Sequence, residues 1–125
     1  MPMRGRVTTD AREAVIALEV LGDDGDRAEI EAVIDTGFTG FLTLPAGLVR
    51  SLSLPLRGSR DVVLADGRVV ALDVYRARVV WHRRALPVSV LESEGGPLVG
   101  MALLRGSELR LWAVDGGDVL IQELP

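Results

Sequence analysis

The segment Ile34-Asp35-Thr36-Gly37 places a carboxylate, a hydroxyl and a glycine at the end of an apolar run. Two carboxylates about 3 Å apart cannot both ionise, so they share one proton, and one member acts as a base while the other acts as an acid. Such a pair can activate a water molecule. Asp-Thr-Gly occurs once in the 125 residues. Two-carboxylate chemistry at Asp35 therefore requires a second copy of the chain, related by a two-fold axis.

Asp-Thr-Gly alone is a weak motif, since average residue usage gives it a chance of roughly a few per cent in a chain of this length. On its own it is equally typical of an Asx-type turn that caps a strand. The flanking residues strengthen the catalytic interpretation. Apolar and acidic residues alternate over 29–34, which predicts a strand that delivers Asp35, and Gly40-Phe41-Leu42 begins a second strand.

Two later segments follow in an order that matters. Ala65-Asp66-Gly67-Arg68 separates two apolar runs, and the Asp-Gly pair predicts a hairpin closed by a type I′ turn. Leu98-Val99-Gly100 predicts a buried strand end that turns into a short helix and stops at Gly106.

The remaining pattern is that of short strands separated by turn residues, with one helix from Pro45 through Leu52. Pro87 indicates an edge position or a bulge in its strand. The fold class expected is mostly β, a closed antiparallel β-barrel with one or two short helices. The expected strands are 13–21, 41–44, 69–80 and 85–91, followed by a last hairpin of 109–114 and 118–121.

Length and composition predict one domain over 1–125, with a core of about 11–121. The net charge of −4, without a basic block, argues against nucleic acid as a partner. No apolar run suits a signal peptide or a membrane span, and the chain has no Cys, so a cytoplasmic protein is expected. The acidic cluster at 23–26 lacks the twelve-residue calcium pattern, and no metal or organic cofactor is expected.

The order of these segments resembles the retroviral-type aspartic proteases, and most closely their single-domain bacterial relatives, over about residues 11–106. The resemblance implies a homodimeric endopeptidase that acts on peptides or proteins. It implies that Asp35 is catalytic, that the Thr36 hydroxyl bonds across the dimer, and that Gly37 lets backbone N–H groups approach the carboxylates. No cofactor is implied.

The resemblance also implies a flap, a hairpin that folds over bound peptide, at Ala65, Asp66, Gly67 and Arg68. It implies that Leu98, Val99 and Gly100 support the catalytic loop from behind. Phe38 stands where viral members usually have Ala, so its ring either swings outward or narrows a substrate pocket. Met101 and Ala102 replace the viral Arg and Asn or Asp after Gly100, so different dimer contacts are expected.

Two alternatives stay open, the first of them because of these departures. One is a non-catalytic dimerisation or peptide-binding module with a protease-like fold. The other is a monomer in which Asp35 only caps a turn. Among other residues, His82 is interpreted as a surface residue without a role. Trp81 and Trp112 are interpreted as packing anchors within apolar strands.

Overall fold

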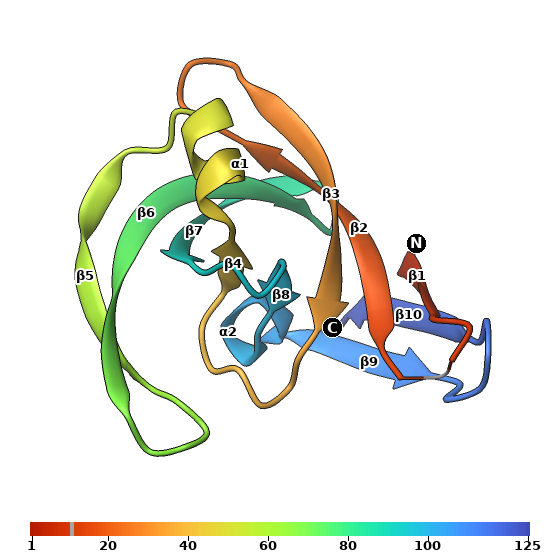
Figure 1. Cartoon of the computed structure of the whole chain (residues 1–125). Helices are drawn as coiled ribbons and strands as arrows, with labels where there is room; N and C mark the ends of the chain where they lie inside the picture. Colours follow the sequence, from red (N-terminus) through yellow and green to blue (C-terminus); the bar gives the residue numbers. More distant parts are fainter. Residues whose placement is uncertain (11) are drawn as a thin grey trace.

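The computed structural model describes residues 1–10 and 12–125 and shows a mostly β protein (Figure 1). Ala11, where the expected core begins, lies outside the described residues. The described part contains two short helices, α1 (Ala46–Ser51) and α2 (Met101–Leu104). Its strands are β1 (Met3–Val7), β2 (Ala14–Leu21), β3 (Arg27–Ile34), β4 (Leu42–Leu44), β5 (Leu56–Val63), β6 (Val69–Trp81), β7 (Arg84–Glu92), β8 (Leu98–Val99), β9 (Ser107–Leu111) and β10 (Asp118–Glu123).

The strands form one sheet in the order β5-β6-β7-β4-β8-β3-β2-β1-β10-β9. An additional pairing of β2 with β6 joins the middle of this order into a ring of strands. The expectation of a mostly β chain with two short helices is confirmed. Most strand pairings are antiparallel, as expected, but β3 pairs with β8 and β4 with β7 in parallel. The cause is that β8 enters between β3 and β4 and can be antiparallel to only one of them.

The core fills the interior of the ring with aliphatic side chains and one tryptophan. Ile30 and Ala32 of β3 are buried while Glu29 and Glu31 are exposed, as the alternation predicts. Trp81 is 2% exposed and packs in the core, so its interpretation as a packing anchor is confirmed. Gly22 N donates to Asp26 O across the exposed acidic turn between β2 and β3.

The two ends of the sheet order, β5 and β9, differ in how they are built. The β5 strand carries Arg57, Arg60 and Asp61, is almost wholly exposed, and has a register shift between Leu56 and Gly58. Gly58 has φ +141°, a conformation that side chains rarely adopt. A bulge and charged side chains prevent a strand edge from pairing with another chain.

The C-terminal hairpin begins and turns earlier than the sequence pattern predicts. Strand β9 ends at Leu111, because Val114 N donates to Trp112 O and Gly117 N to Val114 O, which turns the chain away from extended structure. Trp112 is therefore outside the strand and 49% exposed, and its interpretation as a packing anchor is wrong.

Pro87 lies at a position of β7 that pairs only with Arg78 of β6, since β4 pairs with β7 over Val90–Glu92. The local edge position expected for this proline is confirmed. Among the helices of the described residues, none is long and apolar enough to cross a membrane.

Candidate active site

The Asp35 loop leaves the end of β3 and is fixed by its own backbone. Asp35 N donates to Val99 O at 2.9 Å, so the residue is still tied to the sheet. Its Oδ1 accepts from Gly37 N at 2.9 Å, and its carbonyl oxygen accepts from Phe38 N at 3.1 Å. Asp35 is half-buried, whereas Thr36 and Gly37 are exposed. The carboxylate therefore has a fixed orientation and a peptide dipole directed at it, while the end of the loop faces outward.

The segment expected behind the loop does lie there. Leu98 and Val99 pair with β3 on one side and with β4 on the other. After this strand, Gly100 N donates to Phe41 O at 3.1 Å and Met101 N to Phe38 O at 2.8 Å. Residues at the start of α2 thus satisfy carbonyl groups of the Asp35 loop, and the loop is held from the inside by backbone alone.

Gly100 is required by this close approach. A Cβ atom at this position would collide with Gly40 O and come within 2.7 Å of Phe38 O. Real Cβ atoms do not reach such distances, and backbone oxygens cannot rotate away as side chains do. Only glycine therefore fits at the end of Leu98-Val99-Gly100, because a larger residue would collide with the backbone of the Asp35 loop.

A residue that the sequence interpretation did not single out completes this support. Thr43 is 5% exposed, and its Oγ1 donates to Gly96 O at 3.1 Å and accepts from Leu98 N at 2.9 Å. One hydroxyl thus connects β4 with the loop that leads into β8. The signal in the sequence is a single polar residue within Leu42-Thr43-Leu44, which is otherwise apolar and buried.

Phe38 lies against the loop itself. A Cβ atom at Gly40 would come within 2.6 Å of Phe38 Cζ, and one at Gly100 within 2.5 Å of Phe38 Cδ2. The ring thus occupies the space above both glycines and remains half-buried. It also lines a groove, and that the ring narrows a substrate pocket there stays a prediction.

This groove has a volume of about 360 Å³ and separates the Asp35 loop from the hairpin of β5 and β6. Gly37, Phe38 and Thr39 line one side. The other side consists of residues 60–63 of β5, with Leu91 of β7 also contributing. The structure therefore brings a strand of the expected flap, rather than its tip, to the loop.

The tip itself lies outside this groove. Ala65, Asp66, Gly67 and Arg68 are all exposed, and none of them lines the groove beside Phe38. Figure 1 shows the hairpin projecting from the ring as two long strands on the same side as the Asp35 loop. A tip contact with substrate thus requires a different position of the hairpin.

The turn at the tip is not the type I′ turn that the sequence predicts. Leu64 N donates to Arg68 O and Gly67 N to Leu64 O, which closes a three-residue loop. Gly67 has φ +86°, while Asp66 is not in the left-handed region. The arrangement is a type I turn followed by a left-handed glycine, which is the usual form of a three-residue hairpin loop.

Asp66 accepts a hydrogen bond from the backbone N–H two residues later, as Asp35 does in its own loop. Asp66 Oδ1 accepts from Arg68 N at 3.0 Å, and Oδ2 accepts from Arg68 Nε at 2.7 Å. These bonds, first that from the Arg68 backbone, lower the pKa of Asp66 from its ordinary value. The side chain is nevertheless exposed.

Thr36 lies at a second groove, with a volume of about 260 Å³. Leu109, Leu111 and Ala113 of the C-terminal hairpin line it together with Thr36 and the end of β3. The opposite wall is the start of β2, where Arg12 and Glu13 leave the turn from β1. The Asp35 loop is therefore adjacent to the C-terminal hairpin.

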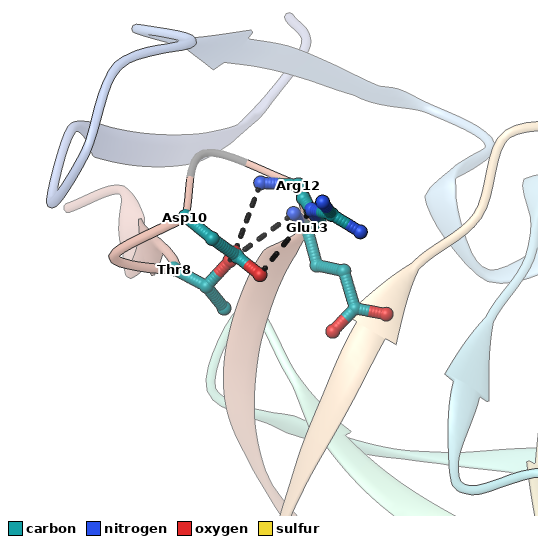
Figure 2. Close-up of polar contacts among 4 residues, drawn as sticks. All are labelled: Thr8, Asp10, Arg12 and Glu13. Carbon is teal, nitrogen blue, oxygen red and sulfur yellow. Dashed lines mark hydrogen bonds and ion pairs between the residues drawn. The ribbon is translucent and has the colours of Figure 1, made fainter.

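Figure 2 shows how the turn from β1 holds that wall. Thr8 Oγ1 donates to Asp10 Oδ1 at 2.7 Å and accepts from Glu13 N at 3.2 Å. Arg12 N donates to Asp10 Oδ1 at 3.3 Å, and its Nε lies 3.6 Å from Asp10 Oδ2. The bond from Thr8 contributes most to lowering the pKa of Asp10.

His82 is remote from the Asp35 loop, in the tight turn between β6 and β7. It is half-buried rather than a free surface residue, and its Nε2 lies 2.8 Å from Ser107 Oγ. Burial lowers its pKa. It lines neither groove beside the Asp35 loop.

Within the described residues, no group of three or more His, Cys, Asp or Glu is arranged to hold a metal ion. No protein-family model, no curated protein and no solved structure matches the chain.

Proposed function

We propose that the protein is a retroviral-type aspartic endopeptidase in which the Asp35 carboxylates of two identical chains activate one water molecule. The observation that carries the proposal is the construction of the Asp35 loop. Its carboxylate is oriented by Gly37 N, and its carbonyl groups are tied down by Gly100 and Met101. We interpret the ring of strands as the closed barrel of this class.

The mechanism follows from two facing carboxylates that share one proton. The ionised Asp35 takes a proton from the water while the water oxygen bonds to the scissile carbonyl carbon. The protonated Asp35 of the second copy donates its hydrogen bond to the carbonyl oxygen and stabilises the tetrahedral intermediate. Return of a proton to the amide nitrogen breaks the carbon–nitrogen bond and restores the shared-proton state.

The groove beside Phe38 supports a peptide as the substrate. Phe38, Val62 and Leu91 give it apolar walls, while Arg60 and Asp61 place charges at its β5 side. An extended peptide presents alternating side chains and backbone polar groups, which suits a groove of mixed character beside a strand. In this proposal Arg68 and its neighbours in the tip reach the peptide only when the hairpin closes.

The test is the Asp35→Asn variant. Asn has nearly the same size and still accepts the Gly37 N–H bond, but it cannot ionise. We expect hydrolysis of a peptide library to fall by at least about 10²–10⁴-fold, with the fold and the dimer unchanged. Asp115→Asn, in the exposed turn of the last hairpin, is the matched control and keeps full activity. An Asp35→Asn variant as fast as the parent contradicts the proposal.

A second candidate is a dimeric peptide-binding module without cleavage. Two observations favour it: the Phe38 ring covers Gly40 and Gly100, and Asp35 does not line the groove that Phe38 lines. It predicts that the parent protein binds peptides but cleaves none between acidic and neutral pH. The monomeric alternative, in which Asp35 only caps a turn, predicts a single species in sedimentation equilibrium at all concentrations.

A further inference from the structure

The outer edge of β9 has free backbone groups. Trp112 N donates to Asp118 O and Leu124 N to Gly106 O, which sets the phase of hydrogen bonding between β9 and β10. Because bonded pairs alternate in an antiparallel ladder, Glu108 and Arg110 direct their N–H and C=O groups toward β10. Leu109 and Leu111 direct theirs away from it. Within the described residues, no strand pairs with this edge.

The edge of β9 lacks the bulge that interrupts β5. It contains no proline or register shift. The end of the hairpin instead exposes large apolar side chains, with Leu111 at 42%, Trp112 at 49% and Val114 at 59%. A five-residue strand edge beside exposed apolar side chains is the kind of surface that another strand covers.

The charges on β9 complement those of an identical strand. Glu108 and Arg110 lie on one face and are both exposed, and within the chain Arg110 Nε is 3.6 Å from Glu108 Oε1. If two β9 strands pair antiparallel with Leu109 opposite Leu109, Glu108 of each chain faces Arg110 of the other. Leu109 is the position that allows this register, because its backbone groups point outward.

The same hairpin lies beside the Asp35 loop. Leu109 and Leu111 line one groove together with Thr36. A two-fold axis through β9 therefore places both Asp35 loops on the same side of the joined sheets. The site of the proposed enzyme is incomplete without a second copy of the chain. The strand that covers this self-complementary edge is therefore β9 of that second copy.

We propose that two copies of the chain dimerise by antiparallel pairing of β9 with β9, in the register that places Leu109 on the two-fold axis. This inference rests on the proposed function for the identity of the partner. It adds the surface, the strand direction and the register.

The test uses Glu108→Arg and Arg110→Glu in separate chains. Each variant alone places like charges opposite each other at two symmetric positions, and we expect its dimer dissociation constant to rise about tenfold or more. When the two variants are mixed, every cross-strand pair is again of opposite charge. The mixture should recover the dissociation constant of the parent, measured by sedimentation equilibrium, although each chain keeps its internal like-charge pair.

A backbone variant tests the edge independently of charge. Leu111→Pro removes an outward N–H that has no hydrogen-bond partner among the described residues, whereas Leu111→Ala removes the same side chain and keeps the N–H. We expect the proline variant to dissociate and the alanine variant to remain closer to the parent. Circular dichroism confirms that both are folded.

The outcomes separate this inference from the proposed enzyme. A dimer that ignores both charge reversals and the proline overturns the β9 interface, even if Asp35 proves catalytic. A dimer that follows the mixing pattern but cleaves no peptide overturns the proposed function and leaves the interface standing.

Discussion

The Asp35 loop and the tip at Asp66 use the same local bond and differ in everything around it. In both, the aspartate carboxylate accepts the backbone N–H two residues later, from Gly37 and from Arg68. The Asp35 loop is also bonded from inside by Gly100 and Met101, whereas Asp66 finds its further partner in Arg68. The comparison teaches that tertiary support, rather than the turn motif, distinguishes the Asp35 loop from the tip at Asp66.

Removing that support should have the largest effect. In Gly100→Ala the new methyl group meets Gly40 O and Phe38 O, so the backbone must shift, at a cost of about 1–3 kcal/mol or more. Chemical denaturation should show a lower midpoint, and any hydrolytic activity should fall with it. Gly47→Ala in α1 is the control, because a Cβ there meets nothing and replacing a helix glycine stabilises by about 0.5–1 kcal/mol. Equal effects of the two substitutions would contradict the steric argument.

Thr43→Val should have the next largest effect. Valine has the same shape but leaves Leu98 N and Gly96 O without their bonds to the hydroxyl, which costs about 1–3 kcal/mol of unfolding free energy. Thr43→Ser keeps the hydroxyl and should lose much less. A valine variant as stable as the parent means that these two groups find other partners.

Hydrogen exchange should separate the two loops directly. The amides of Leu64 and Gly67 close an exposed turn, whereas those of Asp35 and Met101 lie within the supported loop. We expect the first pair to exchange faster, because local opening of the hairpin breaks few contacts. A peptide-like inhibitor should slow the hairpin amides, as expected for a flap. Equal protection in both regions, unchanged by inhibitor, would argue against a mobile flap.

The smallest expected effect concerns the pH dependence of the tip. The pKa of Asp66 is lowered in the folded protein, so its ionised form stabilises the turn above the ordinary pKa of Asp. This contribution is lost as the pH falls through the lowered value. An NMR titration should place the Asp66 carboxyl below free Asp, and Arg68→Ala should move it toward the ordinary value. Global stability should change little, because the group is in solvent. An Asp66 titration that is unaffected by Arg68→Ala would contradict the bond.

The sequence predicts the fold well where one face of a strand is buried. Alternation over 29–34 identifies β3, and the apolar segment Leu98-Val99-Gly100 identifies the turn into α2. The sequence does not predict the fold where hydrogen bonding, rather than burial of one face, determines whether a segment is a strand. Strand β1 carries Arg4, Gly5 and Arg6, so its pairing with β10 leaves no apolar signal. Trp112 looks like part of a strand because it is apolar, yet the chain turns there.

The candidate site shows the same limit. Asp35 and Gly100 are 65 positions apart and were associated through a resemblance, since no local pattern joins them. Thr43 was missed, because a buried hydroxyl between two distant segments is visible only once both are placed. The turn at Asp66 was assigned the wrong type, because Asp-Gly permits both two-residue and three-residue loops and the register of β5 with β6 selects between them.

The bulge at Gly58 has a consequence for the size of any assembly. A sheet with two open ends can add copies indefinitely, whereas a sheet with one open end can only pair end to end and stop. Because the shift between Leu56 and Gly58 interrupts the β5 edge, we expect growth through the proposed β9 interface to end at two copies. Restoring a regular β5 edge should therefore turn a closed pair into a chain-forming protein, which light scattering would reveal as a steady rise in particle size.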